Sequence, residues 1–284
     1  MTCAVPSGVR AAIPLLALWL AAPGLAQTRP AADLPMWELG VGGFGVTQQA
    51  NPGASAQVRR GLALPFLIYR GEYLRVDRET VGLRAINLPR YEVDIGFAGA
   101  FGSRAGDSES RRGMPELGTL VEFGPRLKLN LGPVVNGDGR LRAEFALRGV
   151  FDLNDKFRNK GVSFEPRLVW EQRGGGNGTW RYGASAGALL GNRKLADTFY
   201  AVAPADALPG RPAYSAESGL IALRLGANAS REITPDLRLF LFGRLDSVAG
   251  AANRASPLVR KTTGASVGVG LVYTFARSSR RASD

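Results

Sequence analysis

Long segments of this sequence alternate strictly between apolar and polar residues. In 140–152, Leu141, Phe145 and Leu147 alternate with arginines and a glutamate, and the pattern recurs in 117–131, 162–171, 237–246 and 264–275. A period of two places successive side chains on opposite faces, which indicates β-strands with two different faces. Such segments exceed the average globular strand of about 5–6 residues. They reach the roughly 9–11 residues that a tilted strand needs to cross a bilayer.

We therefore expect an all-β fold, an antiparallel up-and-down transmembrane β-barrel of about 12 strands. Short polar turns and longer links alternate along the chain, as expected if the turns face the periplasm and the loops face outward. A soluble β-sandwich also alternates and remains the competing fold. The predicted strands are 37–47, 62–70, 73–78, 81–88, 90–101, 117–131, 140–152, 161–173, 178–190, 212–229, 235–246 and 262–275, with 73–88 being one bent strand or two short ones.

The first residues have the organisation of a cleaved secretory signal. Arg10 precedes an apolar run at 11–22, and Gly24 and Ala26 are small residues ahead of a cleavage point. The apolar run is shorter than the roughly 20 residues of a membrane-spanning helix. The expected organisation is a signal peptide at 1–26, an N-terminal lead at 27–36, the barrel at 37–275 and a basic C-terminal tail at 276–284.

Several motifs suggest catalysis, but the composition argues against it. The chain has no histidine, and its single cysteine, Cys3, lies in the predicted signal. Residues 183–187 match the G-x-S-x-G motif of hydrolases, but Ser185 has no imidazole base to activate it. Residues 40–45 match G-x-G-x-x-G without a helix to follow, so they are better interpreted as strand glycines, with a bulge as one explanation. We expect no catalytic, cofactor-binding or metal-binding residue and predict that the chain is not an enzyme.

The formal net charge is +12, but the basic residues are not grouped as in nucleic-acid-binding modules. They share strand faces with glutamates, which allows two interpretations. Opposite charges can pair across strands and fill a narrow lumen, or the arginines can line a constricted path for anionic solutes. The candidate lumen-lining residues are Arg126, Lys128, Arg142, Arg148, Arg167, Arg224, Arg238 and Arg244, together with Glu122, Glu144 and Glu165.

Two further surface features are expected if the chain spans a membrane. Basic residues of the loops, at Arg104, Arg111 and Arg112, can attract anionic lipopolysaccharide. Aromatic residues near the strand ends can form the girdles of a membrane barrel; alternatively, they simply follow the preference of aromatic residues for strands. These residues are Trp37, Tyr69, Tyr73, Tyr91, Trp170, Trp180, Tyr182, Tyr273 and Phe275.

Short motifs occur in a characteristic order along the chain. They are WELGVGGFG at 37–45, LPFLIYRGEYL at 64–74, FYAV at 199–202, YSAESGL at 214–220, SPLV at 256–259 and GLVYTF at 270–275. In these motifs the chain resembles the MipA/OmpV family of outer-membrane proteins. The first loop departs from the family pattern, with NPGAS at 51–55 in place of an aromatic residue followed by Gly-Ser-Asp.

The resemblance implies a barrel in the outer membrane of a Gram-negative bacterium, in contact with membrane lipid and lipopolysaccharide. It implies a structural or scaffold role that links murein-remodelling enzymes, a murein transglycosylase and a penicillin-binding protein. The barrel-assembly machinery is expected to read Tyr273 and Phe275, which in this chain are followed by a nine-residue extension. The alternative is a narrow, porin-like channel for small anionic solutes.

Overall fold

The computed structural model describes residues 34–70, 74–76, 81–83, 86–87, 90–100, 102, 108–134, 139–173 and 180–281. The predicted signal peptide, Tyr73 and Arg104 lie outside these residues.

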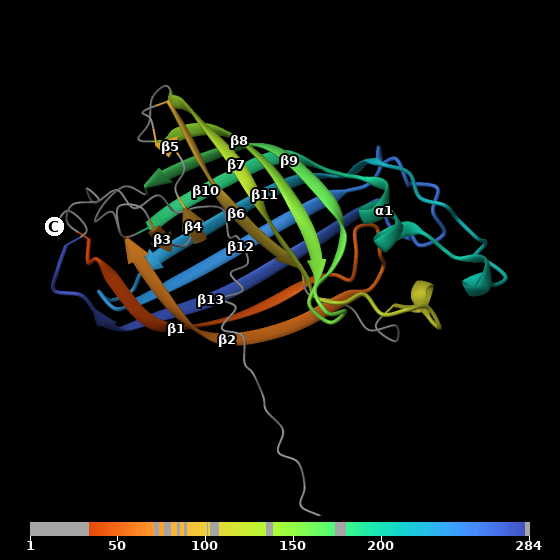
Figure 1. The fold of residues 1–284 in the computed structure, drawn as a ribbon, viewed down its shortest axis with the longest axis horizontal. Helices are drawn as coiled ribbons and strands as arrows, with labels where there is room; N and C mark the ends of the chain where they lie inside the picture. The colour runs from red at the N-terminus through yellow and green to blue at the C-terminus, as the bar shows by residue number, and fades with distance from the viewer. Residues whose placement is uncertain are drawn as a thin grey trace, which may run out of the picture.

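Within the described residues, ten long antiparallel strands form one curled sheet (Figure 1). Their bounds are β1 (Trp37–Gln49), β2 (Gln57–Arg70), β6 (Tyr91–Ala100), β7 (Leu120–Pro133), β8 (Arg140–Asp152), β9 (Arg158–Arg173), β10 (Trp180–Gly191), β11 (Gly219–Glu232), β12 (Leu237–Ser247) and β13 (Thr263–Arg277). Three short strands, β3 (Leu74–Val76), β4 (Val81–Leu83) and β5 (Ile86–Asn87), occupy the region predicted at 73–88. The predicted strand at 81–88 is thus divided into β4 and β5, and β2 begins five residues before its predicted start at 62.

The sheet has the up-and-down order predicted for a barrel. Every strand pairs with a neighbour in sequence, and the first long strand, β1, pairs antiparallel with the last, β13. The two edge strands of the sheet are β4 and β5, and only residues 84–85 lie between them in the sequence. The all-β, antiparallel fold class is confirmed.

The sheet is apolar on its outer face and polar on much of its inner face, which is the reverse of a soluble protein. Large apolar side chains such as Leu225, Val267 and Leu245 are exposed, while Glu144 and Asp94 are buried on the inner face. An outward apolar face is stable where the surroundings are hydrocarbon, and pairing among the strands satisfies the backbone groups. No helix in the described part of the chain is both long enough and apolar enough to cross a membrane.

The two ends of the curled sheet differ (Figure 1). The loop end carries the connections 50–56, 108–119, 153–157, 192–218 and 248–262, and the turn end carries the connection 233–236 and the C-terminus. Many of the predicted girdle residues, including Trp37, Tyr91, Tyr182 and Tyr273, are exposed near the turn end. Near the loop end, neighbouring rings of Phe97, Phe123, Phe151 and Phe157 stack with centroids 4.9–6.3 Å apart.

A helix, α1 (Arg193–Tyr200), lies where the sequence predicted an irregular link at 191–211. Asn192 begins it: the side-chain Oδ1 accepts a hydrogen bond from the backbone of Leu195 at 3.1 Å and a second one from Val162 of β9 at 3.0 Å. The predicted strand at 212–229 is wrong at its start, because β11 begins only at Gly219. Residues 212–218 belong instead to the loops, where Tyr214 pairs with Val202 through backbone hydrogen bonds.

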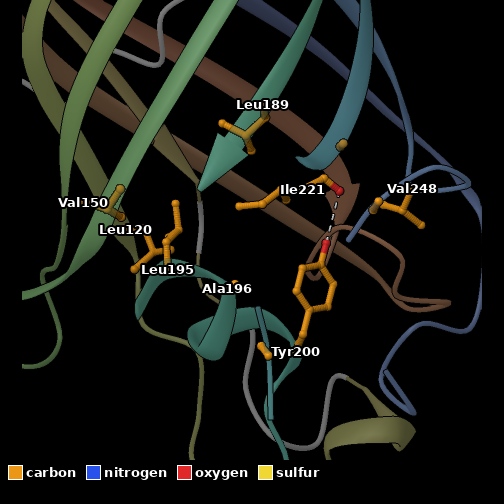
Figure 2. Close-up of a cluster of buried hydrophobic side chains, with 11 residues drawn as sticks. Leu120, Val150, Leu189, Leu195, Ala196, Tyr200, Ile221 and Val248 are labelled. Atoms are coloured by element: carbon orange, nitrogen blue, oxygen red, sulfur yellow. Dashed lines mark hydrogen bonds between the residues drawn. The ribbon is translucent and has the colours of Figure 1, made fainter. Parts of the chain in front are cut away.

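At the loop end, α1 and the described parts of the long connections form a packed cap against the strands. Figure 2 shows Leu195, Ala196 and Tyr200 of α1 beneath Leu189 and Ile221 of the strands. The Tyr200 hydroxyl donates to the Ile221 carbonyl at 3.4 Å, and Ser256 donates to the Tyr200 carbonyl at 2.7 Å. Burial raises the pKa of Tyr200 above its usual range.

Backbone and arginine contacts join the other loops to the cap. The Gly53 carbonyl accepts hydrogen bonds from the backbones of Arg260 and Lys261, which ties the first loop to the last. Arg211 donates to the carbonyls of Ser110, Arg112 and Asp206 at 2.7–3.2 Å. The cap is therefore a folded unit rather than a set of independent loops.

Arg111 lies within this cap. Its side chain donates to the Phe199 carbonyl at 3.4 Å, and burial, together with the neighbouring Arg211, lowers its pKa to about 10. Arg111 is buried and Arg112 is exposed, so of these two loop arginines only Arg112 presents its side chain at the surface; the attraction of lipopolysaccharide stays a prediction.

Candidate functional site: the charged interior

All eleven candidate lumen-lining residues lie on the inner face of the curled sheet, on strands β7, β8, β9, β11 and β12. The alternation places them there, since residues two apart share one face. The structure brings most of them into direct ionic contact, and it adds partners that the sequence did not single out. The added partners are Glu38, Arg70, Glu92, Asp94, Glu171, Arg181, Glu232 and Asp246.

Asp94 is the shared acceptor of the β6–β7 part of the interior. Its carboxylate accepts hydrogen bonds from Arg126 Nε at 2.9 Å and Nη2 at 2.7 Å, and Lys128 Nζ lies 2.8 Å away. Asp94 is 1% exposed, so this two-cation arrangement excludes water. Bidentate pairs of arginine and carboxylate are among the strongest hydrogen-bonded ion pairs.

Glu144 joins β8 to β9 in the same way. Arg142 Nε lies 2.6 Å from one carboxylate oxygen of Glu144, and Arg167 Nη2 lies 2.5 Å from the other. Arg142 also reaches Glu171 at 2.8 Å, so it connects two carboxylates.

A third group extends from β8 to β12. Glu165 accepts from Arg148 at 2.7 Å and from Arg224 at 3.1 Å, and Arg148 also lies 3.6 Å from Glu122. The carboxylate of Asp246 continues this group: Arg224 Nε lies 3.3 Å from it and Arg244 Nε lies 3.0 Å from it. With Glu122 included, this network joins side chains of β7, β8, β9, β11 and β12.

At the turn end the charges are less completely matched. Glu232 accepts from Arg181 at 2.9 Å and from Arg238 at 2.7 Å, while Arg70 lies 2.6 Å from Glu38. Arg238 Nε and Nη1 and Arg181 Nη1 are buried and have no hydrogen-bond partner among the described residues. Buried donors without partners carry a desolvation cost of about 1–3 kcal/mol.

The inner face is not charged throughout. On β2, β12 and β13 it carries the buried cluster Phe66, Ile68 and Val272, against which Phe240 packs. Apolar, aromatic side chains of the interior are therefore concentrated on β2, β12 and β13, where they lie on the same strands as Arg70, Arg238 and Arg244.

The motifs that suggested catalysis occupy ordinary strand positions. Ser185 lies in the middle of β10, opposite Val169 and Gly226, whereas a nucleophile elbow requires a strand-to-helix turn. The G-x-G-x-x-G segment lies in β1, where the pairing with β13 shifts between Leu39 and Gly40, consistent with the predicted bulge. The described residues hold no group of three or more acidic, histidine or cysteine side chains suited to a metal ion.

A curled antiparallel sheet with an apolar outer face and a charged interior defines an outer-membrane β-barrel protein. The chain belongs to the MipA family: the family model described as "MltA-interacting protein MipA" matches residues 39–275. The resemblance seen in the sequence motifs is thereby confirmed.

Several solved structures are similar to this chain at low TM-scores. The NanC porin is 9% identical over 82% of this chain and 98% of its own, with a TM-score of 0.37. Outer membrane phospholipase A from Escherichia coli is 13% identical over 86% and 94%, with a TM-score of 0.34. A Pseudomonas aeruginosa FadL homologue is 8% identical over 86% and 91%, with a TM-score of 0.31. At these scores the similarities indicate nothing about function. No curated protein matches the chain.

Proposed function

We propose that this protein is a non-enzymatic, structural barrel of the Gram-negative outer membrane that serves as a scaffold for murein-remodelling enzymes. The observation that carries the proposal is the filled interior. Glu144 and Asp94 are each bound by two cations and buried, and the cap of α1 and the long loops packs over the loop end. An interior occupied in this way favours a stable body over a wide pore.

The partner classes are a murein transglycosylase and a penicillin-binding protein. The description of the family, MltA-interacting protein, supports the first of them. Murein lies on the periplasmic side, so the contacts belong to the turn end. There the exposed connection 233–236 and residues 278–281 offer polar and basic surface.

A narrow anion path is the second candidate function. It is favoured by one observation, the buried N–H groups of Arg148, Arg181 and Arg238 that have no hydrogen-bond partner among the described residues. An anion that passes along the inner face would meet these donors.

Planar bilayers and a binding assay separate the two candidates. For the scaffold, we expect no conductance steps from the reconstituted chain. We also expect saturable binding of a purified lytic murein transglycosylase to the detergent-solubilised chain. Anion-selective conductance steps with no binding of the enzyme would contradict the scaffold function and support the channel function. The variant Thr234→Trp, in the exposed connection at the turn end, is expected to weaken the enzyme's binding, while Thr198→Trp in the cap is the matched control.

A further inference from the structure

Three inward-facing phenylalanines lie beside the arginines of the turn end. Phe240 and Phe242 follow Arg238 along the inner face of β12, and Phe66 precedes Arg70 on that of β2. We call Phe66, Phe240 and Phe242 the phenylalanine wall, and Arg70, Arg181 and Arg238 the arginine cluster.

Glycines on the neighbouring strands make room for two of these rings. A β-carbon at Gly268 of β13 would overlap the ring of Phe242, and one at Gly40 of β1 would overlap the ring of Phe66. In the register, Phe66 lies opposite Gly40, Phe242 opposite Gly268 and Phe240 opposite Gly270. The rings of Phe66 and Phe242 therefore lie over bare backbone. Phe66 is buried at 2% exposure, whereas Phe240 and Phe242 are half-buried, so these two rings provide the accessible apolar surface of the wall.

The arginine cluster has more donors and more positive charge than its partners satisfy. Among the described residues, three arginines face two carboxylates, Glu38 and Glu232, which leaves an excess of one positive charge in this set. Arg70 also lies near enough to repel the Arg238 guanidinium. The unmatched donors, Nε and Nη1 of Arg238 and Nη1 of Arg181, are well suited to the two oxygens of a carboxylate.

The side chains of Arg181 and Arg238 are partly exposed near the turn end, by 14% and 16%. The side chain of Glu232, which binds both Arg181 and Arg238, is 43% exposed, whereas the cap covers the opposite end of the sheet. A ligand that enters from the turn end meets the arginines first and the phenylalanine wall behind them.

We propose that the turn end of the interior is a binding site for an amphipathic carboxylate, with the carboxylate on Arg181 and Arg238 and an apolar, aromatic body on the phenylalanine wall. The charge would satisfy the unmatched donors, and the body would cover apolar surface at about 25 cal/mol per Å². The site goes beyond the scaffold role and does not depend on it, since the ligand need not cross the barrel.

Isothermal titration calorimetry of the detergent-solubilised full chain tests the site, with 4-phenylbutyrate as the probe. We expect saturable binding at a 1:1 ratio. The uncharged 4-phenylbutyramide should bind at least about tenfold more weakly, because it lacks the negative charge that strengthens hydrogen bonds from the arginines. The ring-less butyrate should also bind at least about tenfold more weakly, because it has no aromatic body to cover the phenylalanine wall.

Variants assign the binding to these residues. Arg238→Gln and, independently, Arg181→Gln should weaken the phenylbutyrate affinity about tenfold or more, and Phe242→Leu should weaken it severalfold. The controls are Arg158→Gln, whose side chain is 70% exposed near the loop end, and Phe145→Leu on the outer face; both should bind as the parent does. Heat-modifiable gel mobility confirms folding for each variant, and Arg181→Gln decides the test if Arg238→Gln fails to fold. Absence of saturable binding, equal binding of the amide, or an equal loss in Arg158→Gln would overturn the proposal.

Discussion

Individual residues of the interior hold charges that have no access to water. Glu144 is fully buried and lies between Arg142 and Arg167, so each of its oxygens balances one guanidinium. The stability of such a group depends on its complete set of partners. Removing one partner of a buried ion pair leaves an uncompensated charge, which usually costs about 3–5 kcal/mol.

The change Glu144→Gln should therefore lower the free energy of unfolding by about 3–5 kcal/mol. Urea unfolding of the chain in lipid vesicles measures the change. Asp236→Asn is the matched control, because the side chains of Asp236 and its partner Arg277 are 47% and 40% exposed and a surface pair contributes less than about 1 kcal/mol. Equal losses in the two variants would show that the interior is not closed to water.

A contact between a glycine and a ring gives a second test at the residue scale. Gly268→Ala places a methyl group where the Phe242 ring lies, and overpacking of this kind costs about 1–3 kcal/mol. In the Phe242→Leu background the same substitution should cost less, since the flat ring is gone. A double-mutant cycle in urea measures the coupling, and a coupling energy near zero would contradict the contact.

Among the elements, α1 is the one on which the cap depends. Its first turn is held by Asn192, which also binds the backbone of Val162, so one side chain fastens the helix to β9. Asn192→Ala should lower the free energy of unfolding by about 0.5–2 kcal/mol, the usual cost of losing the side chain that caps the N-terminus of a helix. It should also speed amide hydrogen exchange in 193–200. Thr198→Ala is the control, because Thr198 is half-buried on the same helix and its hydroxyl bonds only to the Lys194 carbonyl of that helix. Unchanged exchange in Asn192→Ala would contradict the role of Asn192 as the residue that begins the helix.

Elements differed in how far the sequence could predict them. The strand at 140–152 was predicted with the bounds of β8, because charged residues alternate with apolar ones over most of its length. The helix α1 was missed, since eight residues are too few for a clear helical period; Asn192 was the one signal of its start. Residues 212–218 continue no strand, because Tyr214 and Glu217 are held by Val202 and Asn253 of the cap, contacts far apart in sequence.

The charged interior, like the elements, could be predicted only in part from the sequence. Period two was enough to place Arg126, Arg148 and Glu165 on one face of their strands. Which carboxylate each arginine binds depends on the register between strands and could not be predicted from single segments. Asp94 shows this: its own strand gives no sign of a basic partner, and it is bound by Arg126 and Lys128 only through the pairing of β6 with β7.

At the scale of the whole molecule, the apolar outer face and the last strand bear on assembly. Tyr273 and Phe275 are 49% and 57% exposed on β13, so the proposed assembly signal is accessible even though the chain continues beyond it. Phe275→Ser should reduce the amount of heat-modifiable protein in the outer-membrane fraction severalfold. Phe145→Ser, on the outer face of β8, should have a much smaller effect. Equal yields from the two variants would exclude a signal at Phe275.

The pairing of β1 with β13 also bears on the order of folding events. Glu38 lies opposite Arg277, so the seam joins residues from the two extremes of the strand-forming region. Contacts this distant in sequence form slowly, because the loop-closure entropy must be overcome before they contribute stability. The free edge of β1 has no partner strand until β13 has been translated and exported. Throughout that interval β1 is an open edge, available to other chains, which makes protection of the unfinished sheet a kinetic requirement of biogenesis.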